Sequence, residues 1–83
     1  QKFENLLLSV SCNTGDFSLK SLTHIVEKSF RKFELKRFDQ SENSIETVYI
    51  IEAKDLSSVQ QFTDEITKIS KNVKVNYFDN RIA

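Results

Sequence analysis

The sequence predicts an α+β sandwich in which two helices cover one face of a four-stranded antiparallel sheet. The 83-residue chain contains four segments with strand-like alternation and two amphipathic helical segments, in the order βαββαβ. It also divides into two halves of similar length, each consisting of a strand, a helix and a strand. Right-handed crossovers and a hairpin between the second and third strands then give the sheet order 4-1-3-2, which is the ferredoxin-like arrangement.

The first half begins with a strand near residues 2–12, in which Leu6, Leu8 and Val10 alternate onto one face and Leu7 onto the other. A helix follows near residues 18–30. Ser18 is a favourable N-cap, and the apolar Phe17 before it is placed to pack against the first helical turns. The apolar residues that recur at helical spacing are Leu19, Leu22, Ile25, Val26 and Phe30.

The second half supplies the remaining three strands and the second helix. Alternation predicts a strand near residues 32–39, and a polar hairpin loop separates it from a third strand near 44–53, which is rich in Ile, Val, Thr and Tyr. Asp55 is the expected N-cap of a helix near 56–70, and Ser57 with Gln60 offers an alternative capping box. The apolar members of this helix are Leu56, Val59, Phe62, Ile66 and Ile69. The last strand is expected near 72–79.

Length and charge limit the classes of function. Residues 1–83 make one domain with a modest core, and 12 basic residues balance 12 acidic ones, so no global field attracts nucleic acid or an anionic membrane. No apolar run approaches the ~20 residues of a membrane-spanning helix. The chain begins at Gln1 and contains no Met, so we expect it to be part of a longer protein.

The turn between the first strand and the first helix is the first candidate site. It contains Asn13, Thr14, Gly15 and Asp16, and Ser18 follows at the start of the helix. Because glycine reaches positive φ freely, the turn can expose backbone amides at a helix N-terminus and bind a small polar or anionic ligand. The alternative is a purely structural tight turn, in which Asn and Asp make local side-chain hydrogen bonds.

The face of the sheet that the helices leave open is the second candidate. Alternation places Ile45, Thr47, Tyr49, Ile51 and Ala53 beneath the helices. By the same reasoning, the open face should carry Leu7, Phe38, Val48, Ile50 and Phe78. We predict that Leu7, Val48, Ile50 and Phe78 form an interface with a second copy or with the rest of a parent chain. The alternatives are harmlessly exposed aliphatic side chains and pairing through the edge strands.

No constellation predicts catalysis, a metal or a cofactor. His24 has no second histidine and no evident acidic partner, and the single Cys12 excludes an internal disulfide and a cysteine-rich zinc site. Metal carriers of this topology need a second cysteine at the position of Gly15. The basic cluster of Lys28, Arg31, Lys32, Lys36 and Arg37 has no exposed aromatic residues beside it on the first and third strands, which disfavours RNA recognition.

The chain resembles an ACT-like regulatory domain in three features: a first strand that ends in Ser9-Val10-Ser11-Cys12, the Asn-Thr-Gly-Asp turn, and a helix that opens at Ser18. More narrowly, residues 44–55 and 73–79 resemble the C-terminal domain attached to MgtC/SapB-type and related bacterial multi-pass membrane proteins. In the amino-acid-binding ACT turn an Asp precedes the Gly as Asp-x-x-Gly, whereas here Asp16 follows Gly15. The resemblance implies a cytoplasmic, non-catalytic module of an inner-membrane protein that pairs with another copy.

Two functions of different class are therefore expected. The first is a regulatory or assembly domain that senses a small ligand at the first loop. The second is a stand-alone small-molecule binder or minor enzyme that uses the loop Asn13–Asp16 together with His24.

Overall fold

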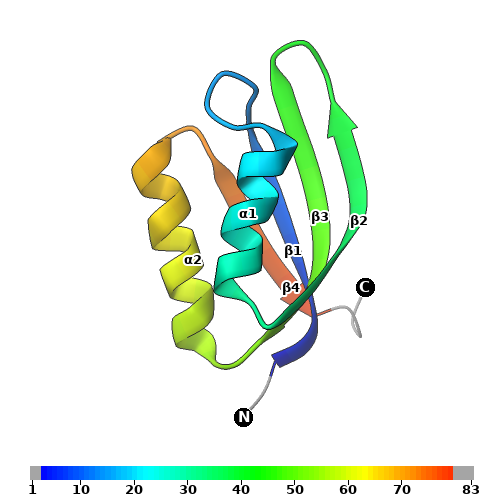
Figure 1. Cartoon of the computed structure of the whole chain (residues 1–83), viewed down its shortest axis with the longest axis vertical. Coiled ribbons are helices and arrows are strands. Elements are labelled where there is room, and N and C mark those ends of the chain that lie inside the picture. Colours follow the sequence, from blue (N-terminus) through cyan, green and yellow to red (C-terminus); the bar gives the residue numbers. More distant parts are fainter. Residues whose placement is uncertain (1–2, 80–83) are drawn as a thin grey trace.

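All six predicted elements are present in the computed structural model, which describes residues 3–79. They are β1 (Phe3–Asn13), α1 (Leu19–Ser29), β2 (Lys32–Gln40), β3 (Ser44–Ala53), α2 (Leu56–Ile69) and β4 (Lys74–Asp79) (Figure 1). Each boundary lies within two residues of the prediction. Residues 1–2 and 80–83 of the predicted domain, including Lys2 of the predicted first strand, lie outside the described residues.

The four strands form one antiparallel sheet in the order β2-β3-β1-β4, which is the predicted order. Both helices lie on the same side of this sheet, with α1 and α2 next to each other (Figure 1). The fold is therefore the ferredoxin-like α+β sandwich. In the part of the chain from 3 to 79, no helix is long and apolar enough to cross a membrane.

The core lies between the sheet and the two helices, and β3 shows how it is built. Its five alternate residues, Ile45, Thr47, Tyr49, Ile51 and Ala53, are all buried, as predicted. The Tyr49 hydroxyl lies 2.9 Å from Thr23 Oγ1 in α1, and the Tyr77 hydroxyl of β4 lies 3.1 Å from Thr63 Oγ1 in α2. Each helix is thus joined to the sheet by a hydrogen bond within a mainly apolar layer, which satisfies a phenol that burial would otherwise penalise.

Both helices begin at the predicted caps. Ser18 Oγ accepts a hydrogen bond of 3.1 Å from the Ser21 amide, and Asp55 Oδ1 accepts one of 3.0 Å from the Ser58 amide. In α1 the cap is reciprocal, because the Ser18 amide also donates to Ser21 Oγ at 2.9 Å. These bonds satisfy amides that have no partner within the helix.

The apolar stripe of α2 is buried in its middle and exposed at its ends. Phe62 and Ile66 are fully buried. Leu56 and Ile69 are the first and last residues of the helix, and 67% and 54% of their surfaces stay exposed. The helical spacing of these residues therefore overstates how far the buried face extends.

A bulge in β2 changes which side chains reach the open face of the sheet. Leu35 lies opposite Tyr49 and Arg37 lies opposite Val48, so Lys36 is an extra residue in the ladder. Beyond Lys36, each side chain of β2 points to the face opposite to the one that strict alternation gives it. Phe38 therefore lies opposite the buried Thr47, on the helix side of the sheet. The prediction that Phe38 belongs to the open face is therefore wrong, because strict alternation does not anticipate the bulge.

Candidate functional site

The first loop is tied to two other parts of the chain. The Thr14 amide donates to the carbonyl oxygen of Asn43, and Thr14 Oγ1 donates to that of Glu42, both at 3.1 Å. Asp16 Oδ2 accepts a hydrogen bond of 2.7 Å from the Ser70 hydroxyl at the end of α2. The loop, the β2–β3 turn and the end of α2 therefore meet at one end of the molecule (Figure 1).

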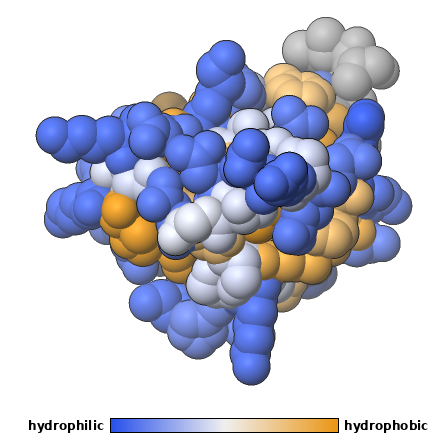
Figure 2. Space-filling view, turned by 90° about the horizontal axis from the view of Figure 1, so that it is seen from above, coloured by the Kyte–Doolittle hydropathy of each residue, from blue (hydrophilic) through white to orange (hydrophobic). Residues whose placement is uncertain are grey.

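The same end is largely hydrophilic when it is viewed along the long axis of the molecule (Figure 2). Asn13, Gly15 and Asp16 are exposed there, and Thr14 is half-buried. The hydroxyl of Ser18 serves as the cap of α1. The five predicted ligand residues belong to one short segment, and the structure gives three of them, Thr14, Asp16 and Ser18, partners within the protein.

Gly15 does not have the geometry that motivated its selection. Its φ is not positive, so the turn does not use the left-handed conformation that only glycine reaches easily. A Cβ built at Gly15 would meet no atom within 4 Å. The expectation that the turn uses a positive φ at Gly15 is therefore wrong, because backbone hydrogen bonds from Asp16 and Phe17 to the Asn13 carbonyl close the turn with ordinary φ values.

His24 lies on the outer surface of α1 in an open hollow of about 600 Å³, lined by Ser18, Lys20, Ser21, His24, Ile25 and Glu27. Its Nδ1 is 3.9 Å from Glu27 Oε1, and the two side chains are 67% and 65% exposed. This distance is too long for a hydrogen bond, and water screens the pair. Asp16 does not line the hollow. The structure therefore does not join His24 and the first loop into one site.

Cys12 is buried, with 3% of its surface exposed. Burial raises the pKa of its thiol, and the nearby Asp16 carboxylate raises it further. A thiol of this kind is protonated at neutral pH and is a poor nucleophile. Among residues 3–79, no group of three or more His, Cys, Asp or Glu side chains is placed to hold a metal ion.

The predicted interface residues lie together on the open face of the sheet. Leu7 lies opposite Ile50 on one side and opposite Phe78 on the other, so three apolar side chains form a continuous row across β3, β1 and β4. Val48 is two residues from Ile50 on the same face of β3. Phe78 is 43% exposed and the other three are half-buried. These four residues are hereafter called the apolar patch.

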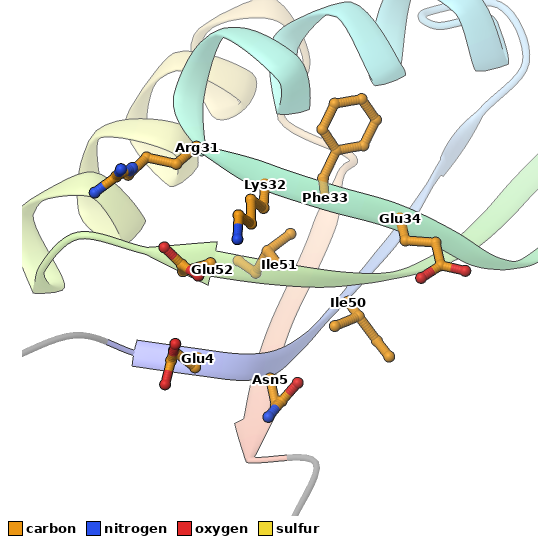
Figure 3. A pocket seen from close by; sticks show the side chains of 9 residues that line it. All are labelled: Glu4, Asn5, Arg31, Lys32, Phe33, Glu34, Ile50, Ile51 and Glu52. Atoms are coloured by element: carbon orange, nitrogen blue, oxygen red, sulfur yellow. The ribbon is translucent and has the colours of Figure 1, made fainter.

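A second hollow, which sequence reasoning missed, borders the patch where β1, β2 and β3 meet. Its volume is about 630 Å³, and nine side chains surround it (Figure 3): Glu4, Asn5, Arg31, Lys32, Phe33, Glu34, Ile50, Ile51 and Glu52. A bulge in β1 opens this corner, and Asn5 has a φ of 59° there. An Asn in the left-handed region is a signal of such a bulge, but it is visible only in the structure.

The predicted basic cluster is dispersed among acidic neighbours. Lys28 Nζ lies 3.4 Å from Glu65 Oε2, Lys36 Nζ lies 3.6 Å from Glu34 Oε2, and Arg37 Nε donates to Asp39 Oδ2 at 2.7 Å. Arg31 and Lys32 line the hollow that also contains three glutamates. These cations therefore form no uniformly positive surface of the kind that nucleic-acid backbones require.

No protein-family model and no curated protein matches the chain. Among solved structures, the chain is similar to a "de novo designed protein Foldit4", with 15% sequence identity and a TM-score of 0.49. The match covers 90% of this chain and 94% of the designed one.

Proposed function

We propose that this chain is a non-catalytic assembly and regulatory module, which associates through the open face of its sheet. The observation that supports the proposal best is the apolar patch formed by Leu7, Val48, Ile50 and Phe78. Both helices lie on the other face, so no element among residues 3–79 covers this row. Apolar side chains grouped in this way, with charged residues around them, are typical of a protein contact.

The charged residues around the patch favour a contact with another protein. Glu46 and Glu52 lie at either end of the apolar positions on β3, and Glu34 lies opposite Ile50 on β2. An apolar centre within a polar rim is the usual anatomy of a protein–protein interface. Burying a large apolar side chain contributes about 1.5–3 kcal/mol when it starts fully exposed. Four partly exposed ones therefore support a weak association rather than an obligate one.

The proposal also includes the protein in which the module acts. The resemblance of residues 44–55 and 73–79 to the C-terminal domain of MgtC/SapB-type proteins supports a cytoplasmic, ACT-like domain of a bacterial inner-membrane protein. In that setting the patch binds a second copy of the domain or another part of the parent chain. The regulatory ligand would be a small polar molecule at the first loop, where Asn13, Gly15 and Asp16 are exposed.

Sedimentation velocity on the purified domain tests the association. We expect the wild type to dimerise as its concentration rises, and Val48→Lys and Ile50→Lys to stay monomeric, because each places a cation in the apolar patch. Gln61→Lys is the matched control, since Gln61 is an exposed residue of α2 on the opposite side of the molecule. Circular dichroism establishes that each variant is folded.

Two results would contradict this part of the proposal. One is that both patch variants fold and associate as the wild type does, which would move the contact to an edge strand. The other is a wild type that stays monomeric at the highest attainable concentration. The ligand is tested separately by thermal shift with amino acids, nucleotides and divalent metals, and no shift with any of them would remove the regulatory part.

A further inference from the structure

The pairing of the strands arranges the open face as three rows that run across the sheet from β4 to β2. The first row is Phe78, Leu7, Ile50 and Glu34; the second is Asn76, Ser9, Val48 and Arg37; the third is Lys74, Ser11, Glu46 and Asp39. Residues directly opposite in a ladder point to the same face, so each row is a line of neighbouring side chains. The first row is apolar over three of its four positions, and the third is polar throughout.

Charge on this face is distributed unevenly between its two edges. The β4 edge contributes one cation, Lys74, whose side chain is exposed. The β2 edge contributes four charges of alternating sign, Lys32, Glu34, Arg37 and Asp39, and the side chain of Asp39 is 52% exposed. In the third row, Lys74 and Asp39 thus stand at opposite edges with Ser11 and Glu46 between them.

The bulge at Lys36 is the reason that Arg37 and Asp39 belong to the open face at the β2 edge. Strict alternation from Phe33, which packs against the core, would direct Phe38 to the open face and Arg37 to the helix side. The extra residue reverses this, so Arg37 and Asp39 reach the open face, where Arg37 Nε donates to Asp39 Oδ2 at 2.7 Å. The bulge therefore replaces the Phe38 side chain on this edge with the Arg37–Asp39 ion pair, whose carboxylate is about half exposed.

Two identical faces can stack about a twofold axis that lies between the sheets, and the direction of the axis decides which residues meet. Stacked sheets lie about 10 Å apart with their strands within about 30° of each other. An axis perpendicular to the strands that passes through the second row, at the centre of the face, would exchange the first and third rows. Leu7 would then face Ser11 of the second copy, and Ile50 would face its Glu46, so apolar groups would be buried against a hydroxyl and a carboxylate.

An axis along the strands keeps each row facing itself and exchanges the edges instead. On the central strands Leu7 then faces Ile50 of the second copy, and only at the edge does an apolar side chain, Phe78, lie against a carboxylate, that of the second copy's Glu34. Lys74 faces the second copy's Asp39, and by symmetry the pair occurs twice. The lysine side chain is long enough to follow the offset that sheet twist produces at the edges.

We propose that the second copy is the occupant of this face, in a twofold dimer whose axis runs along the strands and in which Lys74 of each copy pairs with Asp39 of the other. This inference rests on the proposed function, because it needs association through the open face. It goes further by fixing the partner and the direction of the axis from the charge complementarity of the two edges.

Reversing the charge of Lys74 in one chain and of Asp39 in another tests the geometry. Lys74→Glu and Asp39→Lys are prepared separately, and each places two like-charged pairs in its own homodimer. We expect each to raise the dimer dissociation constant about tenfold at low ionic strength. In an equimolar mixture of the two variants, both edge pairs are again of opposite charge. The mixture should therefore associate with a dissociation constant within about threefold of the wild type.

The controls separate the geometry from folding and from general charge effects. Lys20→Glu makes the same charge change at an exposed position of α1, on the other side of the sheet, and should leave the dissociation constant unchanged. Lys74→Gln and Asp39→Asn remove one charge each and should reduce the salt dependence of dimerisation without repulsion. If a charge-reversed variant does not fold, the salt dependence of dimerisation in these two variants tests the pair instead.

The outcomes distinguish this inference from the proposed function. If Ile50→Lys abolishes association but the mixture of charge-reversed chains does not recover it, the strand-parallel axis is wrong and the sheet-face contact stands. If Ile50→Lys and both charge variants associate like the wild type, the proposed sheet-face contact itself fails. A monomeric wild type overturns this inference and the dimer part of the proposed function, and leaves the parent chain as the occupant of the patch.

Discussion

The Ser70 hydroxyl donates a hydrogen bond of 2.7 Å to Asp16 Oδ2, which joins the end of α2 to a loop 54 residues earlier in the chain. Ser70 is 8% exposed, and its oxygen also accepts a hydrogen bond from the Asn72 amide at 3.1 Å. One serine thus connects the first loop, the end of α2 and the segment between α2 and β4. This contact gives the loop residue Asp16 a structural role, whether or not a ligand binds there.

Ser70→Ala should lower the free energy of unfolding by about 1–2 kcal/mol, because it removes a hydrogen bond to a carboxylate that water only partly replaces. Urea denaturation followed by circular dichroism measures the change. Ser57→Ala, at an exposed position in the first turn of α2, is the control and should change stability much less. If Asp16→Ala and Ser70→Ala have additive effects in a double-mutant cycle, the two side chains are not coupled.

Gly15→Ala should be neutral or stabilise the fold by up to about 1 kcal/mol, because alanine restricts the unfolded chain more than glycine does. The native backbone at this position has no positive φ, and the added methyl group meets nothing within 4 Å. Thermal unfolding of the two proteins measures the difference. A loss of more than about 1 kcal/mol would mean that the loop does require glycine.

The two aromatic residues Phe38 and Phe78 form a matched pair for the interface. They are 41% and 43% exposed, but the bulge directs Phe38 toward the helix side of the sheet and Phe78 lies in the apolar row. Phe78→Glu should weaken dimerisation, because it removes an apolar side chain and places a carboxylate opposite Glu34 of the second copy, and Phe38→Glu should not. Sedimentation velocity at equal concentrations shows the contrast, and equal effects of the two changes would contradict the face assignment.

Alkaline pH should destabilise the protein through two tyrosines, the buried Tyr49 and the half-buried Tyr77. Burial raises the pKa of Tyr49 and of Tyr77 above the ordinary value of 10.0, although the hydrogen bonds from Thr23 and Thr63 oppose the effect. The folded state therefore keeps these protons after the unfolded chain has lost them. The contribution to stability is complete below pH 10.0 and is lost as the pH rises through the folded-state values.

The pH effect is measured as the urea midpoint at neutral pH and at a pH above 10.0. Lysine deprotonation also occurs in that range, so Tyr77→Phe provides the comparison. The variant loses the hydrogen bonds that the hydroxyl makes with Thr63 Oγ1 and with the Val59 carbonyl, and its stability should depend less steeply on pH than that of the wild type. An identical slope in the two proteins would show that Tyr77 does not titrate differently in the folded and unfolded states.

Cys12 should react with thiol reagents only as fast as the protein opens. It is 3% exposed, and burial followed by the charge of Asp16 raises the pKa of its thiol. The rate of labelling with an aromatic disulfide should therefore rise in step with the unfolded fraction as urea is added. Rapid labelling in the absence of urea would show that the end of β1 opens locally.

The sequence by itself determined the six elements, their order in the sheet and the two helix caps. Each of these depends on residues close together in the chain or on a regular period. Alternation in β3 is unbroken, so burial of Ile45, Tyr49 and Ile51 follows from its pattern alone. Ser18 and Asp55 cap their helices through amides three residues ahead, which is also a local relationship.

Only the tertiary structure decided the details of the candidate sites. The bulge at Lys36 exists because β2 pairs with β3 in one register rather than another, and that choice moved Phe38 off the open face and brought Arg37 onto it. The hydrogen-bond partner of Asp16 is Ser70, which lies 54 residues later in the chain, so no local sequence pattern predicts the contact. Periodicity describes one segment at a time, whereas bulges and long-range contacts depend on how two segments meet.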